Sequence, residues 1–125
     1  MSHTVIVHKS PQGVLTQTVE VESHSFTVDE PSPNPHDLLD AALGACTAIT
    51  IHMVAQRKQW PLTDVRVQIT HDEDDDSYRM HRKLELIGAL SAEQRQFLLG
   101  IAGKCPVHRA LHKKIEVDTA LLPAE

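Results

Sequence analysis

Two cysteines, Cys46 and Cys105, have the most specific chemistry in this chain of 125 residues. Cys105 stands directly before Pro106, and proline is favoured at the first position of a helix. A thiol at a helix start lies near unpaired N–H groups and the positive end of the helix dipole, which favour the thiolate. His108 and Arg109, one turn further on, can add positive charge. The pattern therefore indicates that Cys105 is either an acidic, reactive thiol or a substitute for serine as a helix cap.

Cys46 lies in an apolar stretch and by itself indicates a small buried side chain. Its pairing with a second thiol favours redox chemistry. One thiol attacks a peroxide and becomes a sulfenic acid, and the second condenses with it to a disulfide that a reductant reopens. This cycle needs an apolar pocket for an organic peroxide and a cation that holds the thiolate. The spacing does not say which cysteine attacks first, although the argument from the helix start favours Cys105.

The nine histidines of the chain supply an alternative. Cys105, His108 and His112 occupy positions i, i+3 and i+7 on one face of a short helix, a ligand set that suits zinc. The sequence fixes no fourth ligand, for which His52 and Cys46 are candidates. The competing interpretation places His108 and His112 on a solvated face near a helix C-terminus, where cations are favourable. Five further histidines are expected at the surface: His3, His8, His24, His71 and His81.

The element that must position Cys46 is a long helix predicted over residues 34–58. Its middle is apolar or small at nearly every position and on all sides, which predicts a buried helix. The acidic Asp37 suits the helix start, where it opposes the positive end of the dipole. Asp37, Asp40 and His52 interrupt the apolar run, which is also shorter than the roughly 20 residues that a bilayer requires. We therefore expect no membrane span.

The rest of the chain predicts strands and two further helices around this central helix, in an α+β order. The strands are expected at residues 4–8, 14–22, 26–28, 65–70 and 78–90, with a closing strand from Ile115 toward Ala120. The helices are expected at residues 91–103, opened by a capping box from Ser91 to Gln94, and at residues 105–113. Residues 71–76 are expected to form an acidic loop. The pattern predicts one domain over residues 1–125.

Composition and charge narrow the class of protein. The formal net charge of −5 argues against a nucleic-acid partner, because proteins that bind phosphates normally present a basic surface. The chain shows no signal peptide, so we expect a cytoplasmic location, where paired cysteines are more often redox-active or metal-binding than structural. A helix that is apolar on all sides needs more cover than six short strands and two small helices provide. This predicts a homodimer.

Two segments resemble a known family. The stretch PSPNPHDLLDAALGACTAITIHMVAQRKQWPL, which contains Cys46, and the stretch GKCPVHRAL, which contains Cys105, are similar to the OsmC/Ohr family. This family comprises osmotically induced and organic-hydroperoxide-resistance proteins, and its short redox-protein branch is the most similar. The resemblance extends from Phe26 to Ile115 and agrees with the predicted order of strands and helices.

The resemblance implies an intertwined homodimer with buried central helices and an active site at the subunit interface. It implies a thiol-dependent peroxidase that reduces small organic hydroperoxides and consumes an external dithiol, with no metal and no organic cofactor. By match to the family motifs, Cys46 corresponds to the peroxidatic cysteine and Cys105 to the resolving cysteine.

The chain departs from the family pattern at the start of the central helix. The best-studied members carry a glutamate there, held against an arginine from the N-terminal strands, whereas this chain has His36-Asp37 and no arginine before Arg57. We expect Asp37 to stand in for the glutamate, His36 to help orient the site, and Lys9 or Arg109 to supply the cation. The competing hypothesis is a non-catalytic dimer of the same fold that senses redox state or binds a ligand, and a zinc-stabilised domain is the third.

Overall fold

The computed structural model describes residues 2–123, and these residues group into two compact units. The first unit comprises the chain up to residue 42 together with residues 69–80. The second unit comprises residues 43–68 and the chain from residue 81 onward. The prediction of a single domain concerns how the whole chain folds and stays a prediction.

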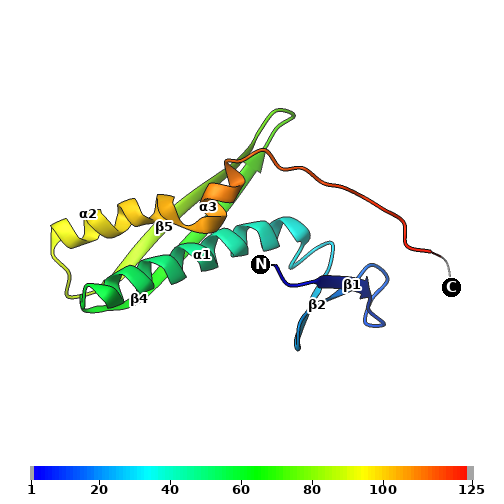
Figure 1. Ribbon diagram of the computed structural model, residues 1–125, viewed down its shortest axis with the longest axis horizontal. Helices are drawn as coiled ribbons and strands as arrows, with labels where there is room; N and C mark the ends of the chain where they lie inside the picture. The colour runs from blue at the N-terminus through cyan, green and yellow to red at the C-terminus, as the bar shows by residue number, and fades with distance from the viewer. Residues whose placement is uncertain (1, 124–125) are drawn as a thin grey trace. The chain divides into compact units, whose positions relative to one another are not determined.

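Three strands form an antiparallel sheet in the first unit: β1 (Val5–Lys9), β2 (Gln17–Val21) and β3 (His24–Val28) (Figure 1). Their β-branched and aromatic residues favour strands. Val7 lies opposite Val19, which lies opposite Phe26, so an apolar row crosses the sheet. The three predicted strands are confirmed, although β2 begins at Gln17 and leaves Val14 in an exposed turn region.

Helix α1 (Pro35–Arg57) is the long helix that the sequence predicts. Its buried residues recur every fourth position and form one stripe: Leu43, Thr47, Ile51 and Ala55. Other apolar side chains of α1 are open to solvent, with Leu39, Ile49 and Met53 exposed by 45%, 59% and 46%. Burial on all sides is therefore not reached within one chain. By length and composition α1 is also able to cross a membrane, a test that the core helix of a soluble protein passes as well.

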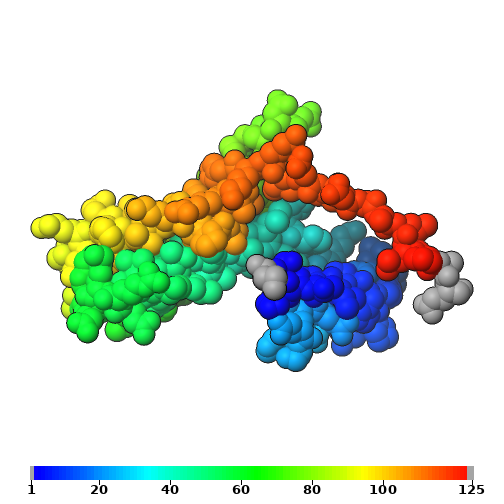
Figure 2. Space-filling view, in the orientation of Figure 1, coloured from blue at the N-terminus to red at the C-terminus, as the bar shows by residue number. Residues whose placement is uncertain are grey.

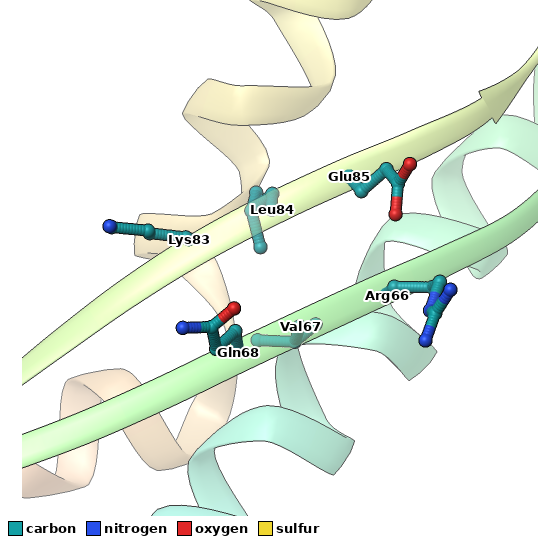
Figure 3. Close-up of a pocket in the computed structure, with 6 residues that line it drawn as sticks. All are labelled: Arg66, Val67, Gln68, Lys83, Leu84 and Glu85. Atoms are coloured by element: carbon teal, nitrogen blue, oxygen red, sulfur yellow. The ribbon is translucent and has the colours of Figure 1, made fainter.

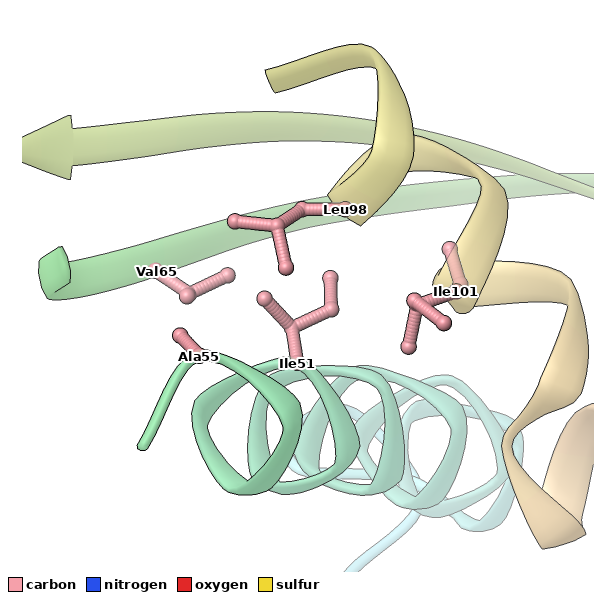
Figure 4. Close-up of a cluster of buried hydrophobic side chains, with 6 residues drawn as sticks. Ile51, Ala55, Val65, Leu98 and Ile101 are labelled. Atoms are coloured by element: carbon pink, nitrogen blue, oxygen red, sulfur yellow. The ribbon is translucent and has the colours of Figure 1, made fainter. Parts of the chain in front are cut away.

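The core of the second unit joins α1 to a hairpin and to a second helix. The hairpin consists of β4 (Leu62–Glu73) and β5 (Tyr78–Gly88), which pair as a two-stranded sheet. Helix α2 (Ala92–Ile101) begins with the predicted capping box of Ser91 and Gln94. Figure 4 shows the side chains that meet between these elements: Ile51, Ala55, Val65, Leu98 and Ile101. A 3₁₀ turn, η1 (Ala102–Lys104), leads from α2 to Cys105 and helix α3 (Pro106–Leu111).

The α+β class is confirmed, but two details of the predicted strands are wrong. The described residues form five strands in two separate sheets, and residues 71–73, predicted as loop, extend β4. The closing strand predicted from Ile115 toward Ala120 is absent from the described residues. A strand needs a neighbouring backbone for its N–H and C=O groups, and none of the strands in residues 2–123 pairs with this segment. Ile115 and Val117 are accordingly 69% and 81% exposed, in the extended segment coloured orange to red in Figure 2.

Gly88 ends β5 in a conformation that favours glycine. Its φ is +150°, and a Cβ at this position would lie 2.1 Å from the carbonyl oxygen of Pro61. We expect Gly88→Ala to lower the free energy of unfolding by about 2 kcal/mol, because backbone strain and a backbone clash act together. Urea unfolding measures this loss.

Gly100→Ala is the matched control for this substitution. A Cβ on Gly100 meets no atom within 4 Å, and the residue lies inside α2. Alanine there should leave the stability unchanged or raise it by about 0.5–1 kcal/mol, since glycine is a poor helix former. Equal stabilities of the two variants would contradict the close approach at Gly88.

Candidate active site

Cys46 and Cys105 come together in the second unit, and both are free thiols. The sulfur of Cys46 accepts a hydrogen bond from the backbone N–H of Val107 at 3.5 Å, two residues beyond Cys105. Cys46 is also one of the groups that lower the pKa of the Cys105 thiol, so the two side chains are neighbours. Cys46 is half-buried on α1, whereas Cys105 is fully buried. The structure thus brings close together the two thiols that a disulfide cycle requires.

Cys105 is the N-cap of α3, with φ −70° and ψ 145°. Its sulfur accepts a hydrogen bond from the backbone N–H of His108 at 3.3 Å, and Pro106 follows at the start of the helix. The capping role and the reactive-thiol role are therefore not alternatives here, because the cap itself delivers an N–H group to the sulfur.

The surroundings of Cys105 favour its thiolate. Burial raises the pKa of the Cys105 thiol, but hydrogen bonds from the His108 backbone, Cys46 and Thr47, together with the charge of Arg82, lower it further than burial raises it. The pKa of Cys105 therefore lies below its ordinary value. This agrees with the prediction made from the helix start.

Arg82 is a residue of the site that the sequence reasoning missed. Its NH1 group donates to Thr47 Oγ1 at 3.0 Å, and its NH2 group lies 3.2 Å from Nδ1 of the His108 ring. The signal was available in the strand pattern, since inward and outward residues alternate along β5 and Arg82 occupies an inward position between Met80 and Leu84.

Arg82 supplies a cation beside the thiols within the second unit. The expectation that Lys9 or Arg109 takes this role stays a prediction. Lys9, one of the two candidates, donates to the backbone carbonyls of Ser10 and Gly13 in the first unit. The family resemblance predicts a cation from the N-terminal strands, whereas the guanidinium beside the thiols in this structure comes from β5.

Thr47 connects the arginine to the cysteines. Its fully buried hydroxyl donates to the carbonyl of Leu43 at 2.7 Å, accepts from Arg82, and lies 3.9 Å from the Cys105 sulfur. Thr47 follows Cys46 directly and belongs to the buried stripe of α1. The periodicity of α1 therefore places the Thr47 side chain in the core, next in sequence to Cys46, where its hydroxyl both donates and accepts hydrogen bonds.

The zinc site suggested by the spacing of Cys105, His108 and His112 is not assembled. Nδ1 of His108 faces the guanidinium of Arg82, and Nδ1 of His112 lies 2.9 Å from the His108 carbonyl. The two imidazole rings stack with centroids 4.6 Å apart. Within residues 2–123, no group of three or more His, Cys, Asp or Glu side chains is arranged to hold a metal ion.

His36 and Asp37 lie in the first unit, at the start of α1. Asp37 and Asn34 form a reciprocal cap, in which each side chain accepts from the backbone N–H of the other at 2.9 Å. The His36 ring stacks on Tyr78 with centroids 5.5 Å apart. Asp37 therefore acts as a helix cap in this structure, and the roles expected of both residues in catalysis stay predictions.

A half-buried carboxylate, Asp40, lies against Tyr78 and His71 in the same unit. The Tyr78 hydroxyl donates to Asp40 Oδ1 at 3.2 Å, and Nδ1 of His71 lies 2.6 Å from Asp40 Oδ2. His71 is half-buried rather than a surface residue as predicted, because this contact and its stacking on Tyr78 hold it against α1. Burial, followed by the charge and hydrogen bond of Asp40, raises the pKa of Tyr78 to about 12.

The ionisation of Tyr78 can be followed alone, since the chain has one tyrosine. We expect its near-ultraviolet titration to have a midpoint at about 12, above the ordinary value of about 10. The folded chain then binds the phenolic proton more tightly than the unfolded chain. The contribution of this proton to the free energy of unfolding is therefore complete below about pH 10 and is lost as the pH rises toward 12. Asp40→Asn should lower the midpoint. An ordinary midpoint in the unmodified protein would contradict the contact.

A surface hollow of about 460 Å³ lies on the hairpin of the second unit (Figure 3). It is lined by Arg66, Val67, Gln68, Lys83, Leu84 and Glu85. Neither cysteine lines this hollow, and its charged side chains are of both signs. The residues that line the hollow are therefore not those of the thiol site.

Comparisons with known proteins agree with this architecture. Residues 28–120 match the family model described as OsmC-like protein. No curated protein matches the chain in sequence.

Three solved structures illustrate the likeness in fold. The OsmC-like protein from Mycoplasma pneumoniae has 16% identity and a TM-score of 0.75, with 89% of this chain and 87% of that chain covered. The organic hydroperoxide resistance protein OhrB of Bacillus subtilis has 18% identity and a TM-score of 0.63, with 90% and 91% covered. The organic hydroperoxide resistance protein OsmC from Legionella pneumophila has 20% identity and a TM-score of 0.63, with 90% of each chain covered.

Proposed function

Since this chain belongs to the OsmC-like protein family, we propose that it is a thiol peroxidase that reduces organic hydroperoxides to alcohols. The observation that carries the proposal is that Cys46 lies at the helix start capped by Cys105, where its sulfur accepts from the backbone N–H of Val107. The pKa of Cys105 is lowered in the same site. Two of the proteins with a similar fold are named organic hydroperoxide resistance proteins, which supports the same class of substrate.

In the first step, the sulfur of Cys46 attacks the terminal oxygen of the hydroperoxide. The O–O bond breaks, Cys46 becomes a sulfenic acid, and the thiol proton leaves with the alkoxide as the alcohol. The half-buried state of Cys46 supports this assignment, because a substrate must reach the attacking sulfur, whereas Cys105 is fully buried.

In the second step, the Cys105 thiolate attacks the sulfenic sulfur of Cys46. The S–S bond forms, the S–O bond breaks, and the departing hydroxide takes up a proton to become water. An external dithiol then reduces the disulfide by exchange. The hydrogen bond from the backbone N–H of Val107 to the Cys46 sulfur supports this step, because it places Cys46 beside the helix start that carries Cys105.

We propose that the active form is a homodimer in the cytoplasm, where dithiol reductants are available. Exposed apolar side chains of α1, among them Ile49 and Met53, support the dimer because a second subunit would cover them. In the dimer, His36 and Asp37 are proposed to orient the site. Light scattering at micromolar concentration tests the assembly, and the mass of a single chain would contradict it.

The peroxidase proposal is tested by anaerobic titration of the reduced protein with cumene hydroperoxide. Free thiols are counted under denaturing conditions, and the same titration is run on Cys105→Ser. We expect one molar equivalent to remove both thiols of the chain, with full recovery after addition of a dithiol. Unchanged thiols after several equivalents would overturn the proposal.

The second candidate function is a redox-sensing dimer without turnover. The use of Asp37 as a helix cap favours it, because this carboxylate is the expected substitute for the glutamate of the best-studied relatives. Formation of the disulfide without repeated consumption of hydroperoxide in the presence of a dithiol would support the sensor and exclude the peroxidase.

A further inference from the structure

The side chain of Arg82 carries an uncompensated charge next to the thiols. It is half-buried at an inward position of β5, and no carboxylate of residues 2–123 forms an ion pair with it. Its hydrogen-bond partners are Thr47 and His108, which are both neutral acceptors at the contacting atoms. A guanidinium that has left bulk water is costly without a counter-charge. An anion is therefore expected within reach of Arg82.

We propose that Arg82 is a positioning residue that holds the sulfur of Cys105 as an anion beside Cys46, acting through Thr47 and His108. The meaning of this for catalysis rests on the proposed peroxidase function. Two structural paths join the guanidinium to the Cys105 sulfur, and each uses one of its two terminal nitrogens.

The first path runs through the hydroxyl of Thr47. Arg82 donates to this oxygen at 3.0 Å, and the same oxygen lies 3.9 Å from the Cys105 sulfur. A hydroxyl has one proton, which here goes to the carbonyl of Leu43. When Cys105 is ionised the hydroxyl can turn its proton toward the sulfur, and the bond from Arg82 strengthens it as a donor.

The second path runs through His108. Its backbone N–H donates to the Cys105 sulfur at 3.3 Å, while its ring Nδ1 faces Arg82 at 3.2 Å. Arginine only donates, so Nδ1 is the accepting nitrogen and the imidazole is neutral. Burial, and then the charges of Arg82 and His112, lower the pKa of His108 in the same sense. The cation of the site is therefore Arg82, and His108 orients the N–H group that meets the sulfur.

Within the cycle, this arrangement prepares the second step. An ionised Cys105 attacks the sulfenic acid of Cys46 at once, so that the S–S bond forms and the S–O bond breaks before a second hydroperoxide arrives. Without Arg82, Cys105 is protonated more often and the sulfenic acid persists. A second hydroperoxide then oxidises Cys46 to the sulfinic acid and leaves as the alcohol.

The test measures the ionisation of Cys105 without any peroxide. In a Cys46→Ser background, thiolate absorbance is followed against pH in Arg82→Gln and in Lys83→Gln. Lys83 is the matched control, because it is the next residue, also cationic, and exposed on the outward face of β5. We expect Arg82→Gln to raise the midpoint by about one pH unit, the shift typical of losing one nearby opposite charge, and Lys83→Gln to leave it unchanged.

Arg82→Lys separates charge from folding. It keeps the charge but cannot donate to Thr47 and His108 in the same fork, so we expect a midpoint between those of the unmodified protein and Arg82→Gln. If Arg82→Gln does not fold, this variant alone decides, because a midpoint equal to that of the unmodified protein contradicts the positioning role. Equal shifts in Arg82→Gln and Lys83→Gln would also overturn it.

A second readout separates this inference from the peroxidase proposal. With both cysteines present and excess cumene hydroperoxide, Arg82→Gln should gain the mass of two oxygen atoms on Cys46, whereas Lys83→Gln should form the disulfide. A shifted midpoint without any oxidation by hydroperoxide would retain the role of Arg82 and reject the peroxidase. Normal turnover with an unshifted midpoint would retain the peroxidase and reject the role of Arg82.

Discussion

Replacing Cys46 by serine should abolish the consumption of organic hydroperoxides. The hydroxyl of serine is a far weaker nucleophile than a thiol and forms no sulfenic acid, and the remaining thiol of Cys105 is fully buried. We expect the loss to reach the rate without protein in an assay that supplies a dithiol. Full activity of Cys46→Ser would refute its assignment as the attacking cysteine.

Cys105→Ser is the matched variant, because it removes the other thiol of the pair. We expect it to consume one equivalent of hydroperoxide and then to stop forming the intramolecular disulfide, with Cys46 held as a sulfenic acid that a sulfenate-specific reagent traps. If Cys105→Ser loses all reaction with hydroperoxide and Cys46→Ser retains it, the roles are exchanged. The buried position of Cys105 argues against that result.

Among the substitutions considered, replacing Ile51 by alanine should cause the largest loss in the free energy of unfolding. Ile51 is fully buried on α1 and packs in the cluster with Val65, Leu98 and Ile101. Removing its outer carbons leaves a cavity, for which we expect a cost of about 3–4 kcal/mol in the free energy of unfolding. Since a domain is typically stable by about 5–15 kcal/mol, this is a large part of the total. Denaturant unfolding measures it.

Ile49→Ala is the control on the same helix. Ile49 is 59% exposed in this chain, so removal of its side chain should cost little in the single chain. A loss at Ile49 that increases with rising protein concentration would reveal the second subunit, because association then stabilises the unmodified chain more than the variant. Equal, concentration-independent losses at Ile49 and Ile51 would contradict the packing described for α1.

Local features of the site were predictable from the sequence. The start of α1 with Asp37, the capping box of Ser91 and Gln94, and Cys105 at a helix start all depend on residues within a few positions of each other. Such signals depend only on side chains and backbone groups that are close together in the sequence. The same holds for the three strands of the first sheet, whose residues favour extended backbone.

Contacts between distant segments were not predictable in this way. The closing strand from Ile115 was expected from alternation alone, but a strand also requires a partner, and none of the described strands supplies one. The polar neighbours of His71 predict a surface position, whereas contact with Asp40 and Tyr78 buries it in part. In both cases the missing information was which backbone or side chain lies opposite.

Residue types and spacing alone predict the two thiols, the long apolar helix that carries Cys46 and the helix start that favours an ionised Cys105. That the two thiols come together and that Arg82 is the cation beside them follows from contacts in the folded chain, not from residue spacing. The physical reason is that charge acts through space: Arg82 is far from Thr47 and from His108 along the chain, and the packing of β5 against α1 and α3 makes them neighbours.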